Sequence, residues 1–133
     1  MADGQLAYNP VGYHNGTVWP HDTAIIATGM ARYGYREEDS RLAVATLEAA
    51  SHFDHRLPEV FVGYSREATQ VPVAYPTACS PQAWASGTPL LLLRVLPGLE
   101  PTADGPVSEP HLFAPINTLT LHGLPGRVDR QPP

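Results

Sequence analysis

The chain has 133 residues, a length typical of one domain, and apolar residues make up 43% of it, enough for a folded core. Its net charge is −5, and its basic residues are all arginines scattered along the chain. A nucleic-acid-binding protein would show a basic patch, and a helix that binds anionic membranes would show a basic face. We therefore expect neither nucleic acid nor a membrane among the partners.

Cysteine content and apolar runs indicate the compartment. Cys79 is the single cysteine, so no intramolecular disulfide can form. We expect it to be a small buried residue. The N-terminus lacks the charged and apolar regions of a secretory signal peptide. The longest apolar run, residues 89–93, is too short to cross a bilayer. A soluble cytoplasmic protein is the expectation.

The spacing of apolar residues predicts helices in the first half of the chain. One helix is predicted to begin near Asp22, a residue type that favours the N-cap, and to end at Gly34. A second covers about residues 36–52, and its acidic first turn suits the positive end of the helix dipole. Because the junction between them is short, we expect an antiparallel hairpin.

A third helix is predicted from Ser80 and Pro81 to about Leu96. Serine is a favourable N-cap residue, and proline fits the first helical position because it has no N–H group to leave unpaired. Pro89 lies inside this helix and should kink it.

Two long stretches lie outside these helices. Residues 57–79 show no clear period, and a loop of that length is usually functional. After Gly98 the chain is rich in proline and glycine, and residues 119–128 are predicted to form one or two short strands. Three helices and a tail give a thin core that leaves apolar groups of the first and third helices uncovered. The chain therefore looks like part of something larger.

Residues 13–22, with the sequence YHNGTVWPHD, concentrate aromatic, imidazole, amide and carboxylate groups around a glycine turn. Sugars are bound by flat rings that stack on their C–H faces and by polar side chains that hydrogen-bond their hydroxyls. The segment therefore predicts the wall of a carbohydrate site. Its candidate ligand contacts are Asn15, Trp19, His21 and Asp22.

Each candidate also has a structural interpretation. Asp22 could cap the first helix, and Trp19 could fill the junction between helices. Asn15 and His14 could serve the turn at Gly16, and we assign His14 to that role.

The remaining groups of polar residues in the sequence predict no cofactor. His52 and His55 flank Asp54, but a third and a fourth ligand at suitable spacing are missing, so no metal is expected. The sequence also has no glycine-rich phosphate loop.

Three motifs occur in order along the chain: YHNGTVWPHD at 13–22, LPEVFVGY at 57–64 and YPTACSPQAWA at 75–85. Together they resemble the C-terminal part of bacterial amylo-α-1,6-glucosidases, glycoside hydrolases of the glycogen-debranching type. The resemblance extends over about residues 8–127.

The resemblance implies an all-α fold. Residues 1–133 would be the C-terminal fragment of a catalytic domain, namely a partial (α/α)6 toroid of about three helices with long loops. Residues 13–98 would be its helical part, and residues 99–133 a short β-like tail.

The resemblance also places the general base at Glu59, in the pattern Pro-Glu-x-Phe-x-Gly. An inverting glycosidase needs one carboxylate that activates water and a second, roughly 6.5–9.5 Å away, that protonates the leaving oxygen. Gln82, at the start of the third helix, could hold a sugar hydroxyl or the attacking water, or could be a solvated first-turn residue. Arg66 could pair with a carboxylate and keep the base ionised, or could equally be a plain surface arginine. Trp84 is expected in the core.

The implied function is that of a fragment of an inverting glycoside hydrolase that acts on α-glucosidic linkages of the α-1,6-glucan type. The earlier helices and the general acid lie outside the match, so we expect the chain to be inactive alone and an N-terminal partner chain to complete the toroid. Two alternatives stay open. One is a non-catalytic carbohydrate-binding or interaction module derived from such an enzyme, and the other is a truncated product with no function of its own.

Overall fold

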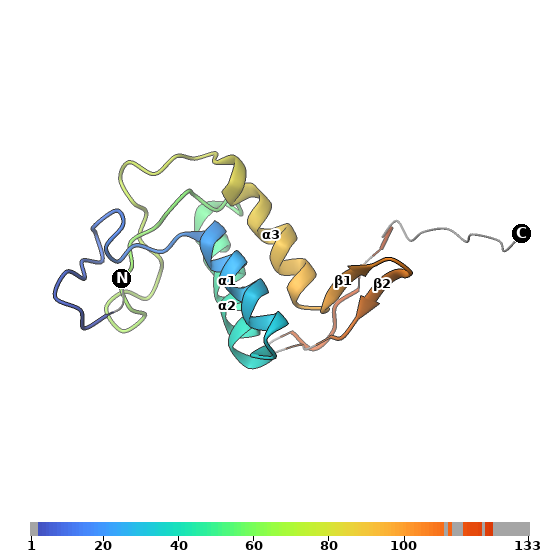
Figure 1. Ribbon diagram of the computed structural model, residues 1–133. Helices are drawn as coiled ribbons and strands as arrows, with labels where there is room; N and C mark the ends of the chain where they lie inside the picture. The colour runs from blue at the N-terminus through green and yellow to red at the C-terminus, as the bar shows by residue number, and fades with distance from the viewer. Residues whose placement is uncertain (1–2, 111, 113–115, 121, 124–133) are drawn as a thin grey trace, which may run out of the picture.

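The computed structural model describes residues 3–110, 112, 116–120 and 122–123. These residues form three α-helices, a single 3-10 turn and a β-hairpin (Figure 1). The elements are, in order, α1 (Pro20–Arg32), α2 (Arg36–Ala50), η1 (Ser51–Phe53), α3 (Ala83–Val95), β1 (Leu99–Thr102) and β2 (Gly105–Ser108).

The expected all-α fold, a partial (α/α)6 toroid, is wrong. The described residues make a small mixed domain that is 38% helical and 9% strand, and β1 and β2 pair as an antiparallel sheet. The helices lie side by side in Figure 1, with the long loops at one end of them and the β-hairpin at the other. Helical periodicity identified the helices but carried no information on the sheet, whose residues are mostly exposed and rich in proline.

The start of α1 differs from the prediction. Trp19, rather than Asp22, is the N-cap residue, with Pro20 at the first helical position. The chain is extended up to Trp19 because Val18 forms an isolated β-bridge with Phe61. Proline then begins the helix without leaving an N–H group unpaired. Asp22 lies in the first turn, where its carboxylate suits the positive end of the helix dipole.

The predicted hairpin of α1 and α2 is confirmed. Gly34 adopts φ of +85°, a left-handed conformation that glycine accepts without strain, and the next residue, Tyr35, donates its N–H to the carbonyl of Met30 at 2.9 Å. This turn ends α1 and reverses the chain, so α2 runs back alongside α1 (Figure 1).

The third helix begins later than predicted. Gln82 is its extended N-cap residue and Ala83 its first helical residue, so Ser80 and Pro81 lie before it. The reason is a hydrogen bond from the backbone N–H of Glu59 to the carbonyl of Cys79 at 3.1 Å. This bond holds the residues just before α3 against the segment that contains Glu59. Pro89 lies inside α3 as predicted.

The hydrophobic core is small and lies where α1 meets α2 and α3. Alanines on α1 and α2 let the helices approach closely, and two leucines at the end of α3 fill the space. The fully buried members of this cluster are Ala24, Ala27, Ala43, Leu92 and Leu96. Large apolar side chains on α1 and α3 remain exposed as expected, among them Ile25 and Leu90. Among the described helices, none has both the length and the apolar character needed to cross a membrane.

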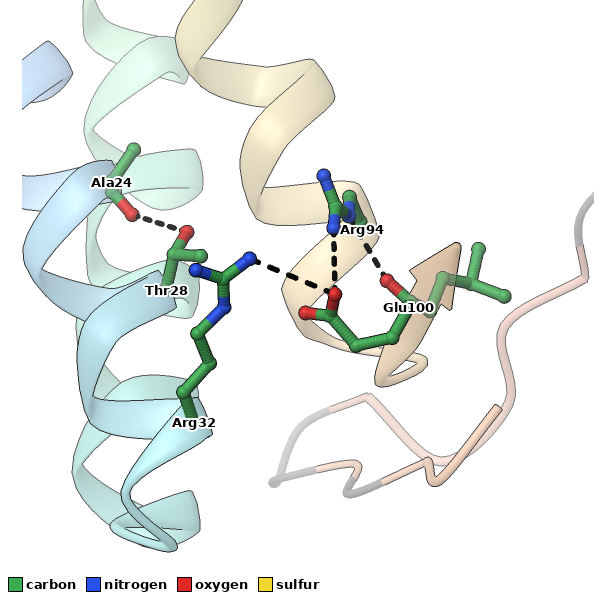
Figure 2. Close-up of polar contacts among 6 residues, drawn as sticks. Ala24, Thr28, Arg32, Arg94 and Glu100 are labelled. Carbon is green, nitrogen blue, oxygen red and sulfur yellow. Dashed lines mark hydrogen bonds and ion pairs between the residues drawn. The ribbon is translucent and has the colours of Figure 1, made fainter. Parts of the chain in front are cut away.

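A cluster of charges joins the β-hairpin to the helices (Figure 2). Arg94 donates to the carboxylate of Glu100 at 2.8 Å and to the carbonyl of Leu99 at 3.0 Å, and Arg32 lies 3.7 Å from the same carboxylate. Partly exposed ion pairs contribute little stability, so their main effect is to orient the hairpin.

The strands themselves are not where the sequence predicted them. They occupy residues 99–108, and residues 119–120 have no regular structure. Residues 122–123 have none either, and the rest of the predicted 119–128 segment lies outside the described residues.

Leu92→Ala should lower the free energy of unfolding by about 2–5 kcal/mol, because it leaves a cavity where a fully buried leucine had filled the core. Leu90→Ala is the matched control on the same helix, since Leu90 is 72% exposed, and its effect should stay within about 0.5 kcal/mol. Urea unfolding followed by circular dichroism measures both. Equal effects of the two substitutions would contradict this assignment of the core.

Candidate functional site

Three extended segments lie side by side at the loop end of the molecule: two belong to the first and second sequence motifs, and the third, residues 73–74, directly precedes the third motif. The middle segment contains Phe61, which forms isolated antiparallel bridges with Val18 on one side and with Ala74 on the other. Val62 adds a hydrogen bond from its N–H to the carbonyl of Val73 at 2.9 Å. The backbone thus brings residues that are distant in sequence into one site.

A glycine contact fixes how closely the first and middle segments approach. A Cβ atom on Gly63 would overlap the carbonyl oxygen of Gly16, so a larger residue does not fit there. The backbone of Gly63 is held at both ends, because its N–H donates to the carbonyl of Pro10 at 2.9 Å and its carbonyl accepts from the hydroxyl of Tyr8 at 2.7 Å.

Glu59 lies at the start of the middle segment and has a buried carboxylate. The residue is 9% exposed. The hydroxyl of Tyr13 donates to Oε1 at 2.8 Å, and the backbone N–H of Cys79 donates to Oε2 at 3.2 Å. Both oxygens therefore have a donor, which is the usual requirement for a buried charge.

These contacts favour the ionised form of the carboxylate. The hydrogen bond from Tyr13 lowers the pKa of Glu59 most, and the backbone N–H of Cys79 lowers it further. Burial acts in the opposite direction but is outweighed, and a hydrogen bond with the side chain of Gln82 also lowers the pKa. The same hydrogen bond to Glu59 raises the pKa of Tyr13, so the proton stays on the phenol and the carboxylate is charged at neutral pH.

A group of aromatic rings surrounds the donor. The ring of Tyr13 lies edge-on to Trp19 at 4.8 Å and to His14 at 4.6 Å, and a tilted contact joins it to Tyr75 at 5.5 Å. His14 stacks on Trp19 with 6° between the ring planes. The indole N–H of Trp19 has acceptors in Thr17 Oγ1 at 3.0 Å and the Tyr13 carbonyl at 3.2 Å. This packing fixes the Tyr13 hydroxyl against the carboxylate.

The structure brings some of the predicted site residues together. Gln82 hydrogen-bonds Glu59, and Trp19 reaches it through Tyr13. His21 instead stacks on Trp84, with ring centroids 5.3 Å apart. Asp22 is exposed in the first turn of α1.

The loop before α1 accounts for the two remaining residues of the first motif. Asn15 is exposed in a turn, where its N–H donates to the carbonyl of Gly12 at 2.9 Å. His14 is expected from the sequence to be a turn residue, and in the structure its imidazole also stacks on Trp19.

Two side-chain predictions are wrong. Trp84 is 47% exposed rather than part of the core, because it lies at the open end of α3. Cys79 is exposed rather than buried, although its backbone N–H contacts Glu59. Of the two alternatives for Arg66 the structure agrees with the surface arginine, because its side chain is exposed and pairs with Glu48 at 2.9 Å, so the donors that keep Glu59 ionised are neutral groups.

Sequence reasoning missed Tyr13 as the partner of Glu59. The residue lies in the aromatic motif that predicted a sugar site, but its carboxylate partner is 46 positions away. Such a pairing cannot be derived from spacing within one motif.

Metal binding receives no structural support, because the described residues contain no cluster of three histidine, cysteine, aspartate or glutamate side chains that could hold an ion.

Comparison of the chain with protein-family models and with curated protein sequences gives no match to either.

Tyr13→Phe should raise the pKa of Glu59 towards the ordinary value of a glutamate, because it removes the strongest hydrogen bond to the ionised form. A ¹³C NMR titration of the Glu59 carboxyl carbon measures the change. Tyr75→Phe is the control, since it keeps the ring beside Tyr13 and should leave the titration nearly unchanged. An unaltered pKa in Tyr13→Phe would exclude this role of the hydroxyl.

The same hydrogen bonds predict how stability depends on pH. Because the folded-state pKa of Glu59 is lowered, its stabilising contribution is complete above the ordinary pKa of a glutamate. That contribution is lost as the pH falls through the lowered folded value. Glu59→Gln should therefore show a smaller loss of unfolding free energy than the wild type when urea unfolding is repeated from neutral pH to about pH 2. Parallel acid dependences would show that Glu59 titrates alike in both states.

Proposed function

We propose that this chain forms part of the site of a glycoside hydrolase that acts on α-glucosidic linkages, with Glu59 as the general base that activates water. The observation that carries the proposal is the buried, ionised carboxylate held by Tyr13 and by the backbone of Cys79. The resemblance of the three motifs to glycogen-debranching amylo-α-1,6-glucosidases supplies the substrate class, an α-1,6-linked glucan.

The geometry around the carboxylate suits a base. A carboxylate oxygen can accept two hydrogen bonds, so a donor on each oxygen leaves capacity for a water molecule. A carboxylate fixed by two donors keeps one orientation, and a general base must be within hydrogen-bond reach of the proton that it removes. Its lowered pKa keeps it unprotonated and ready to accept that proton at neutral pH.

The neighbouring side chains suit a glucose unit. The amide of Gln82 can hold a hydroxyl beside the base, and Trp19 and Tyr13 provide aromatic surface next to it. The exposed polar groups of Asn15 and Asp22 and the half-buried imidazole of His21 form the outer contacts of the proposed site.

The general acid belongs to another chain in this proposal. The resemblance of the three motifs does not extend to the helices that would carry the acid, which an inverting enzyme holds roughly 6.5–9.5 Å from the base. A partner that supplies the acid would also cover the exposed apolar side chains of α1 and α3, such as Ile25 and Leu90. The need for a partner chain that supplies the acid does not depend on an (α/α)6 toroid, an architecture that the fold rules out.

The same composition of the site favours a second candidate, a non-catalytic carbohydrate-binding module. Such a module would use the aromatic and amide groups for binding, and Glu59 as a hydrogen-bond acceptor for sugar hydroxyls. In that case no partner chain would supply a general acid, and the site would bind sugar without hydrolysing it.

Isothermal titration with isomaltose, an α-1,6-linked glucose disaccharide, tests the shared part of both candidates. Trp19→Ala should weaken binding about tenfold or more, because it removes an aromatic surface of the site. Tyr33→Ala is the control, since Tyr33 is a highly exposed aromatic residue at the far end of α1. Gentiobiose, the β-1,6-linked isomer, should bind more weakly than isomaltose. Absence of isomaltose binding to the wild-type chain would overturn both candidates.

A hydrolysis assay tests the missing acid. The isolated chain should release no glucose from isomaltose above the uncatalysed rate, since acid–base catalysis needs both carboxyl groups. Turnover that Glu59→Gln abolishes would show that the acid is present in this chain. Sugar binding that survives Glu59→Gln, without hydrolysis in any mixture with an acid-bearing partner chain, would favour the binding module.

A further inference from the structure

A groove runs along α2, and residues of the extended segments, among them Val18 and Phe61, line part of it. It consists of two hollows of about 550 Å³ and 440 Å³ that share lining residues and are therefore continuous. The shared residues are Leu42, Ala45, Glu48 and Arg66. The floor of the groove is largely apolar, and its charged groups come mainly from one row of α2 side chains.

That row is called here the α2 stripe and consists of Glu38, Arg41, Ala45, Glu48 and His52. Its members are spaced by three or four residues, so they follow one face of the helix and its continuation into η1. All of the polar members are exposed, and Ala45 is half-buried at the centre. From end to end the stripe is about 21 Å long at 1.5 Å per residue.

The order of charges along the α2 stripe is complementary to its own reverse. Reading from the N-terminal end, the stripe presents acid, base, alanine, acid and imidazole. If a second α2 stripe lies antiparallel with Ala45 against Ala45, Arg41 comes opposite Glu48 of the second copy. Glu38 then comes opposite the imidazole of His52. A parallel arrangement would instead place like charges together, which is unfavourable.

We propose that the α2 stripe is a homodimer interface, in which two copies of this chain pack their α2 helices antiparallel about a two-fold axis near Ala45. Such an isologous contact makes each interaction twice, so two Arg41–Glu48 pairs form for one interface. The short side chain of Ala45 at the crossing point permits a close approach of the helices.

The wall of the groove already contains one ion pair. Glu48 is already held by Arg66 at 2.9 Å, which fixes its carboxylate at the wall of both hollows. Arg41 of the second copy adds a second cation to this carboxylate, while its aliphatic stem covers the apolar floor near Leu42. Neither hollow is lined by Glu59, Tyr13 or Trp19, and the contact does not use the sugar-binding groups, so the proposal stands or falls independently of the proposed function.

Two charge reversals test the pairing. Arg41→Glu alone places an acid against Glu48 of the other copy, and Glu48→Arg alone places a cation against Arg41. Each single variant should weaken self-association by at least about tenfold. Mixed together, the two variants regain both opposite-charge pairs and should form a heterodimer of wild-type affinity. Arg56→Glu, at an exposed residue that does not line the groove, is the control and should leave dimerisation unchanged.

Sedimentation equilibrium from about 1 μM to about 1 mM covers the affinities expected of a modest interface. The wild type should pass from monomer to dimer in this range, with circular dichroism confirming that each variant is folded. A wild-type chain that is monomeric at the highest concentration would overturn the proposal. So would a dimer that is insensitive to Arg41→Glu, or a mixture of the two reversals that fails to associate.

Discussion

The hydrogen bonds between Glu59, Tyr13 and Cys79 are the contacts on which the rest of the site depends. They join the three sequence motifs through a single residue, because Tyr13 comes from the first motif and Cys79 from the third. The carboxylate is buried and charged, so it requires these donors, and the loops that carry them are fixed in return. Long loops without regular structure thereby acquire one defined arrangement.

The helices supply the frame for this arrangement. Trp19 and Gln82 are the N-cap residues of α1 and α3, so each lies at the end of a helix that faces the loops. Because α1 and α3 pack against each other around a small core, the separation of these two residues is set by helix packing. The carboxylate of Glu59 then lies beside Gln82, and the aromatic group lies beside Trp19.

Local features were predictable from the sequence, and long-range ones were not. The helices near 20–33 and 36–50 follow from apolar spacing and from Gly34, and the polar segment before α1 marked Trp19 as a site candidate. The cap at Trp19 was missed because the bridge between Val18 and Phe61, which extends the chain there, joins residues 43 positions apart. The sheet was missed because proline-rich, exposed strands lack the alternation that identifies a half-buried strand.

The central claim is that the charged carboxylate of Glu59 faces a bound sugar. The most direct measurement is the ¹³C chemical shift of its carboxyl carbon at neutral pH while isomaltose is added. The account predicts a displacement that saturates with the ligand and that the β-linked isomer gentiobiose does not reproduce at the same concentration. A signal that stays in place while isomaltose saturates the protein elsewhere would contradict it.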